Sequence, residues 1–104
     1  MNPKIEKALA FWQKKINEYY AERFPNLVPP TLSLKYGRKY IKVIAERRGG
    51  GYGDRYVHSF FDAAGNIYRA ASWQAPAKHV RGHVDDPDYS WGRGVNEYGG
   101  TYLK

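Results

Sequence analysis

The sequence contains no cysteine, a single methionine, and only ten acidic residues against seventeen Lys and Arg. Without cysteine the chain can form no disulfide, no thiolate-held zinc site and no cysteine nucleophile. No apolar run approaches the roughly 20 residues that a membrane-spanning helix needs, so we expect no membrane partner. The first residues, Met1 to Lys4, contain no apolar signal region, so we expect a cytoplasmic protein.

The 104 residues that are present suit one domain, 1–104, because domains usually hold about 100 to 200 residues. Apolar residues make up 42% of the chain, enough for a core, which argues against disorder. The net charge is +7, and ten residues are tyrosine, whose apolar ring carries a hydroxyl that needs a partner. The composition therefore predicts a small, soluble, basic domain.

Residues 3–24 are predicted to form an amphipathic helix. Apolar side chains recur at helical spacing from Ile5 to Ile16, and Lys and Glu fill the other side. Pro3 suits the first helical position and Pro25 ends the helix. The apolar face is expected to pack on a sheet, and a groove for a partner helix is the alternative.

Alternation of apolar and polar residues predicts an antiparallel β-meander of about four strands within residues 31–73. A tight loop is expected between the last two strands, with Gly65 at positive φ and the Asp62 side chain bonded to the following backbone. The fold class is therefore α+β, with the helix packed on the meander. The predicted strands are 31–35, 40–47, 55–61 and 67–73.

The pattern breaks in residues 74–104. We expect a short helix or turn after Pro76, followed by an irregular segment that packs back on the domain because it is rich in aromatic residues. Residues 101–103 are a candidate edge strand. An exposed strand edge, or the helix face that carries Trp12, could support a homodimer.

Positive charge is concentrated between Lys35 and Arg55, where seven Lys and Arg against two carboxylates give +5 in 21 residues. Basic groups neutralise phosphates and aromatic rings stack on bases, so this stretch is a candidate nucleic-acid or phosphate site. The alternative is a solvated basic face, or one that binds an acidic protein. The candidate residues are Lys35, Tyr36, Arg38, Lys39, Tyr40, Lys42, Arg47, Arg48, Tyr52, Arg55 and Tyr56.

A glycine-rich loop lies inside this stretch and resembles an arginine–glycine RNA-binding segment. Its backbone N–H groups could cradle a phosphate. The loop opens a strand and not a helix, so neither the Rossmann nor the P-loop context is met. A hairpin loop without a ligand is the alternative. Its glycines are Gly49, Gly50, Gly51 and Gly53.

A second cation pair, Lys78 and Arg81, follows Pro76 at a spacing of three residues. On a helix the two side chains would point together and clamp a phosphate or carboxylate. Together with the glycine-rich loop they could capture a phosphorylated nucleotide. The alternative is a structural corner in which Trp73 fills the core and the cations are solvated.

We predict no cofactor, no metal and no catalytic residue. His79, His83, Asp85 and Asp86 are weak candidate metal ligands, because imidazole and carboxylate could hold zinc or manganese for a hydrolase. The serines lack a nucleophile-elbow pattern, which makes an enzyme the minority interpretation. His58 lies in an aromatic strand and is expected to be packed or hydrogen-bonded.

The run Ala-Ser-Trp-Gln-Ala-Pro-Ala-Lys-His-Val-Arg-Gly, residues 71–82, stands out from its surroundings. With the preceding hairpin at residues 60–68 and the tail at 98–103, it resembles a group of small accessory proteins of tailed bacteriophages. The resemblance covers roughly residues 26–103. It implies an accessory protein in the cytoplasm of a bacterial host that binds nucleic acid, or that acts in host takeover or anti-defence as an inhibitor of a host protein. It implies no catalytic residue.

Overall fold

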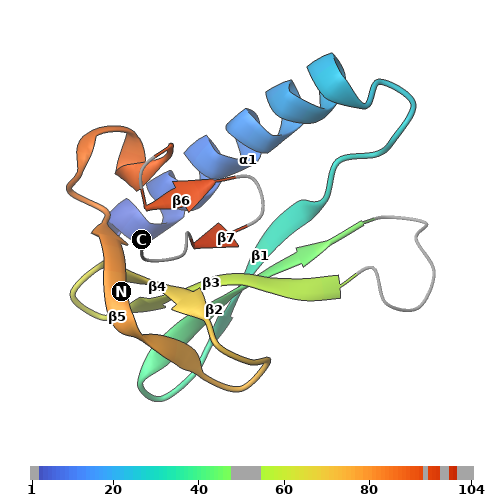
Figure 1. Ribbon diagram of the computed structural model, residues 1–104. Coiled ribbons are helices and arrows are strands. Elements are labelled where there is room, and N and C mark those ends of the chain that lie inside the picture. The colour runs from blue at the N-terminus through green and yellow to red at the C-terminus, as the bar shows by residue number, and fades with distance from the viewer. Residues whose placement is uncertain (1–2, 48–54, 93, 97–98, 101–104) are drawn as a thin grey trace.

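Helix α1 (Pro3–Arg23) lies across one face of a five-stranded antiparallel sheet in the computed structural model, which describes residues 3–47, 55–92, 94–96 and 99–100 (Figure 1). This arrangement confirms the predicted α+β class. The five strands pair in chain order, so the sheet is a meander. The elements after α1 are β1 (Thr31–Tyr36), β2 (Tyr40–Glu46), β3 (Arg55–Asp62), β4 (Asn66–Ala70), β5 (Pro76–His83), the 3₁₀ turn η1 (Pro87–Ser90), β6 (Val95–Asn96) and β7 (Gly99–Gly100).

The core lies between α1 and the sheet. Trp12 is fully buried, and its ring stacks on that of Phe61 with 5.2 Å between centroids. The indole Nε1 donates a 3.1 Å hydrogen bond to the Tyr89 carbonyl, so the polar atom of this buried ring has a partner. Ile5 and Ile16 are buried on the same side of the helix. The predicted packing of the apolar helix face on the sheet is therefore confirmed.

A bulge in β3 decides which of its side chains face the helix. Val43 pairs with Ser59, and the next residue, Ile44, pairs with Val57, so His58 is an extra residue in β3. An extra residue reverses the alternation of side chains beyond it. Odd-numbered residues of β3 therefore face the core on one side of the bulge, and even-numbered residues face it on the other side.

The β3–β4 turn is built as predicted. Gly65 has φ 91°, and the Asp62 carboxylate accepts 3.0 Å hydrogen bonds from the backbone N–H groups of Ala64 and Asn66. The Tyr68 hydroxyl donates to the same carboxylate at 2.9 Å. Burial by itself would raise the pKa of Asp62, but these hydrogen bonds outweigh burial and lower it.

The segment after β4 differs from the prediction. The short helix expected after Pro76 is wrong, because residues 76–83 form β5 beside β4. β4 ends at Ala70, before the predicted end of that strand, and residues 71–75 form the β4–β5 turn. The Ser72 hydroxyl caps this turn by accepting the backbone N–H groups of Gln74 and Ala75, both at 3.2 Å.

The C-terminal segment packs back on the domain, as expected from its aromatic content. Strands β6 and β7 form a two-stranded sheet near β3 and β4. Gly99 has φ 126°, and a Cβ at this position would lie 2.1 Å from the His58 carbonyl oxygen, so only glycine fits the contact. The edge strand predicted at 101–103 lies outside the described residues. In the described part of the chain no helix is long and apolar enough to cross a membrane.

Candidate nucleic-acid interface

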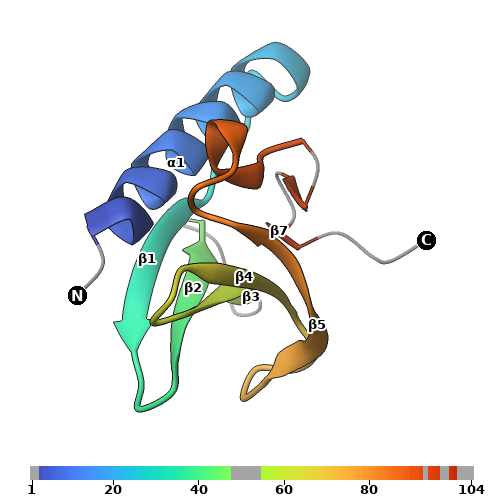
Figure 2. The same ribbon diagram turned by 90° about the vertical axis from the view of Figure 1, so that its left-hand side faces the viewer.

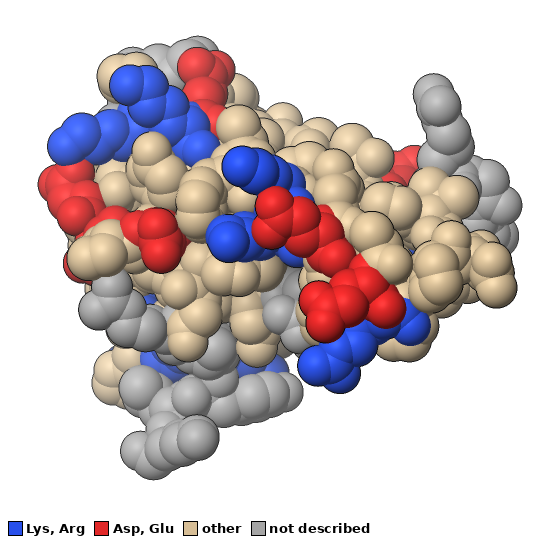
Figure 3. Space-filling view, turned by 90° about the horizontal axis from the view of Figure 1, so that it is seen from above, with Lys and Arg blue, Asp and Glu red and all other residues tan. Residues whose placement is uncertain are grey.

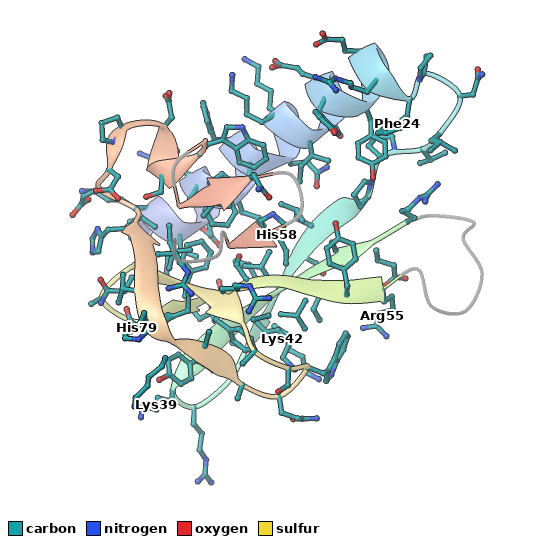
Figure 4. The ribbon with its side chains drawn as sticks, in the orientation of Figure 1. Phe24, Lys39, Lys42, Arg55, His58 and His79 are labelled. Carbon is teal, nitrogen blue, oxygen red and sulfur yellow. The ribbon has the colours of Figure 1, made fainter. Side chains whose placement is uncertain are left out.

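The sheet face away from α1 carries most of the described candidate cations. The β1–β2 and β4–β5 turns both project on this side (Figure 2), and Lys39, Lys42 and Arg55 point away from the helix (Figure 4). Because β1, β2 and β3 are neighbours in the sheet, cations distant in sequence come together here. We call this surface the cationic face and define it by Lys35, Tyr36, Arg38, Lys39, Tyr40, Lys42, Arg55, Phe60, Trp73 and Gln74.

Two lysines on this face oppose each other directly. Lys35 of β1 and Lys42 of β2 are cross-strand partners. Like charges in this position destabilise a sheet. Partial burial lowers the pKa of Lys42, and the nearby positive charge of Lys35 lowers it further. The fold therefore holds two positive charges close together, and their repulsion costs free energy that a bound anion would offset.

A pocket of about 330 Å³ surrounds this pair. Its described walls contain four cations and no carboxylate, which makes it suited to an anion. The walls come from the β1–β2 turn and from the β4–β5 turn, and Phe60 lies between them on β3. The lining residues are Lys35, Tyr36, Gly37, Arg38, Lys39, Tyr40, Lys42, Phe60 and Gln74.

A larger pocket of about 570 Å³ lies against the same β1–β2 turn but reaches Pro3, Ile5 and Ala63. It shares Arg38 and Lys39 with the smaller pocket and lacks the opposed lysine pair. The smaller pocket therefore has the stronger electrostatic attraction for phosphate, although its volume is lower.

Trp73 lies over the strands of the cationic face. The Lys42 Nζ is 4.8 Å and the Arg55 Cζ 5.4 Å from the centroid of its ring. Both distances suit cation–π attraction. The side chain is 39% exposed, so the alternative in which Trp73 fills the core is wrong. The Arg55 Nε also pairs with the Glu46 carboxylate at 3.0 Å, so this end of the face carries one carboxylate beside its cations.

Tyr40 and Phe60 form the aromatic floor of the face. The Tyr40 ring meets those of Phe60 and Tyr68 edge-on, with centroid distances of 6.3 and 5.6 Å. The Lys39 Nζ lies 5.6 Å from the Tyr40 centroid. Tyr36, at the end of β1, is 48% exposed and offers a ring to a ligand. The face thus combines fixed rings, an exposed ring and cations.

Other candidates from the basic stretch lie elsewhere. Tyr56 packs against the core, on the helix side of the sheet, so its ring lies apart from the pocket. Arg47 follows β2 and is partly buried. The remaining candidates lie outside the described residues, namely Arg48, Gly49, Gly50, Gly51, Tyr52 and Gly53.

The predicted clamp of Lys78 and Arg81 is also corrected. It required a helix, on which residues three apart share a face, but both residues belong to strand β5. Lys78 is exposed, and the Arg81 Nη1 donates to the His79 carbonyl at 3.3 Å. The helical geometry of the clamp is therefore wrong, and nucleotide capture, which also involves the glycine-rich loop outside the described residues, stays a prediction.

The four weak metal candidates do not form a metal site, and no group of three or more potential ligands does so in the described parts of the chain. The His83 Nε2 donates to the Ala64 carbonyl at 2.8 Å, while its Nδ1 accepts the Asp85 backbone N–H at 3.0 Å. The Asp86 carboxylate accepts from the Ser90 hydroxyl and from the His83 backbone N–H. These side chains stabilise the β5–η1 connection.

His58 is packed and hydrogen-bonded, as expected. Its side chain is 1% exposed, and its ring lies 5.4 Å from that of Trp12. The Nδ1 is 3.0 Å from the Ser59 hydroxyl and the Nε2 is 3.0 Å from the Asn96 carbonyl. Since a carbonyl only accepts, Nε2 carries a proton and donates it to Asn96.

The helix side of the molecule has a different charge pattern. Viewed from above, Asp and Glu lie beside Lys and Arg across this surface (Figure 3). Lys4 pairs with Asp85, and Lys15 with Glu18. Mixed charges of this kind are typical of a solvated surface, whereas the pocket of the cationic face lacks described carboxylates.

The protein is thus a small α+β domain with one basic sheet face, and the sequence predicted only part of that face. Charge density indicated its lysines and arginines, but Phe60, Trp73 and Gln74 were missed because they lie outside the basic stretch. The chain belongs to the family of unknown function DUF7717, whose model matches residues 4–103. Comparisons with curated proteins and with solved structures found no significant match.

Proposed function

We propose that this protein is a non-enzymatic nucleic-acid-binding protein and that the cationic face is its binding surface. The observation that carries the proposal is the opposed pair Lys35 and Lys42 in a pocket without described carboxylates. A phosphate between the two ammonium groups would relieve their repulsion, and a chain of phosphates would engage the cations on either side.

The aromatic residues support nucleic acid over a simple anion. Tyr36 and Trp73 are exposed beside the cations. Bases stack on such rings, whereas inorganic phosphate or an acidic protein needs no ring. The accessory role in a bacteriophage-infected cell rests on the sequence resemblance and stays a prediction.

Salt dependence tests the proposal. Fluorescence anisotropy with labelled 12-nucleotide DNA and RNA, single-stranded and duplex, measures the Kd at 50 and 200 mM NaCl. If the four cations of the pocket each neutralise one phosphate, the affinity should fall roughly 50-fold for single strands and roughly 150-fold for duplexes between these salt concentrations. Absence of binding to every probe, or equal affinity at both salts, contradicts the proposal.

The ring contribution is measured in the same assay with Trp73→Leu, with Trp73→Phe as the control that keeps a ring. We expect the leucine variant to lose roughly fivefold or more in affinity and the phenylalanine variant to lose much less. An affinity that neither variant changes, or that both lower equally, would contradict the stacking role of Trp73.

A further inference from the structure

The pocket in the cationic face lies between two turns. One wall is the β1–β2 turn with Gly37 to Lys39, and the opposite wall is Gln74 from the β4–β5 turn. Both turns project from the sheet on the side away from α1 (Figure 2). The floor contains Phe60, which is 2% exposed. A ligand in the pocket would therefore lie between the two turns, beside the partly exposed ring of Tyr40.

This geometry distinguishes a single strand from a duplex. In a duplex the bases are stacked and paired inside, so a base can enter the pocket only after it leaves the stack, which costs free energy. In a single strand an unstacked base is available at lower cost. A pocket with cations on its walls and rings below them suits the phosphates and one base of the same strand.

Gln74 gives the pocket a group that matches a base edge. Among the residues that line the pocket it contributes the only side-chain amide, which offers donors and an acceptor together. Its side chain makes no hydrogen bond to another described residue. A glutamine amide can pair with two adjacent groups on a base edge, whereas a lysine only donates.

We infer that the cationic face takes a single strand, DNA or RNA, with one unstacked base in the pocket beside Tyr36 and its edge on the Gln74 amide. The inference rests on the proposed function and adds to it the strandedness of the ligand and a residue that reads the base. The phosphates on either side of that base would lie on Lys35, Arg38 and Lys42.

The test compares single strands with the blunt duplex of the same 12 nucleotides at 100 mM NaCl, in DNA and in RNA. We expect at least tenfold tighter binding of the single strand for one sugar type or both. Gln74→Ala should weaken single-strand binding at least about fivefold for the preferred base and flatten the ranking among adenine, pyrimidine and mixed-sequence strands. Duplex affinity should not change.

Asn26→Ala is the matched control, since it removes an exposed amide from the connector after α1. Circular dichroism verifies that both variants fold. Equal affinity for single strand and duplex, or an unchanged ranking in Gln74→Ala, overturns the inference while salt-dependent binding still supports the proposed function. Absence of binding to every probe overturns both.

Discussion

At the scale of single residues, His58 shows how the fold fixes a protonation state. Its imidazole is buried between α1 and the β6–β7 sheet, and both ring nitrogens have partners. Burial lowers the pKa of His58 to about 4, and the hydrogen bond to Asn96 opposes this only in part. The residue therefore links β3 to the C-terminal segment as a neutral group.

This leads to a prediction about stability and pH. An unfolded histidine has a pKa of about 6.5, so between pH 6.5 and pH 4 the unfolded chain binds a proton that the folded chain does not. The free energy of unfolding should fall through this window as the pH decreases, by about 3 kcal/mol in total, and this contribution should be level outside it.

Urea unfolding of the wild type and of His58→Gln at pH 7.5, 5.5 and 4.5 measures the effect. Glutamine can retain the hydrogen bond to Asn96 but does not titrate, so the difference between the two proteins isolates His58. Parallel pH dependences of the two proteins would show that burial of this imidazole has no such consequence.

The bulge at His58 also explains which residue roles escaped the sequence. If the side chains of β3 alternated strictly from Phe61 backwards, Tyr56 would point away from the helix and Arg55 would point toward it. The extra residue reverses both, so Tyr56 packs on the core and Arg55 reaches Trp73. A bulge has no reliable signal in one sequence, because it depends on the partner strand.

At the scale of elements, the helix completes the edge of the sheet. The Gln13 Oε1 accepts the Leu32 backbone N–H at 2.6 Å, and its Nε2 donates to the Pro30 carbonyl at 2.9 Å. One amide side chain thus takes the place of a neighbouring strand at the start of β1. Such cover reduces the tendency of an edge strand to pair with another chain at this point.

We therefore predict that Gln13→Ala destabilises the protein by about 1 to 2 kcal/mol, because two backbone groups lose their partner. The neighbouring exposed Lys14→Ala is the control and should change the free energy of unfolding by less than about 0.5 kcal/mol. Urea denaturation midpoints of the two variants decide the matter. An equal effect of both would show that Gln13 adds nothing to β1.

The helix and the first four strands were predictable because each has a clear period in the sequence. β5 was not, since it is an edge strand with few buried side chains, and its register against β4 shifts twice. Its Pro76 also suits the first turn of a helix, which favoured the wrong element. The alternating pattern also predicts Trp73 within the preceding strand. β4 instead ends at Ala70, because the Ser72 hydroxyl caps the turn that follows.

At the scale of the whole molecule, charge differs between the two sides of the sheet. The helix side mixes signs (Figure 3), whereas the pocket on the other side brings together four cations. The sequence indicated a net +5 between Lys35 and Arg55, but a charge count along the chain does not show which side of a sheet each cation faces. The antiparallel pairing of β1 and β2 opposes Lys35 to Lys42 and so brings two of these charges together on one face.

The most direct measurement of the central claim is the salt dependence of nucleic-acid binding by Lys35→Ala/Lys42→Ala. Its control is Lys7→Ala/Lys14→Ala, which removes the same charge from exposed positions on α1. The pair on the cationic face should cost at least tenfold in affinity at 100 mM NaCl and reduce the slope of log K against log salt by about 1.5. The control pair should leave the slope unchanged. An equal loss of affinity and slope in both double variants would contradict the account, because net charge alone would then explain binding.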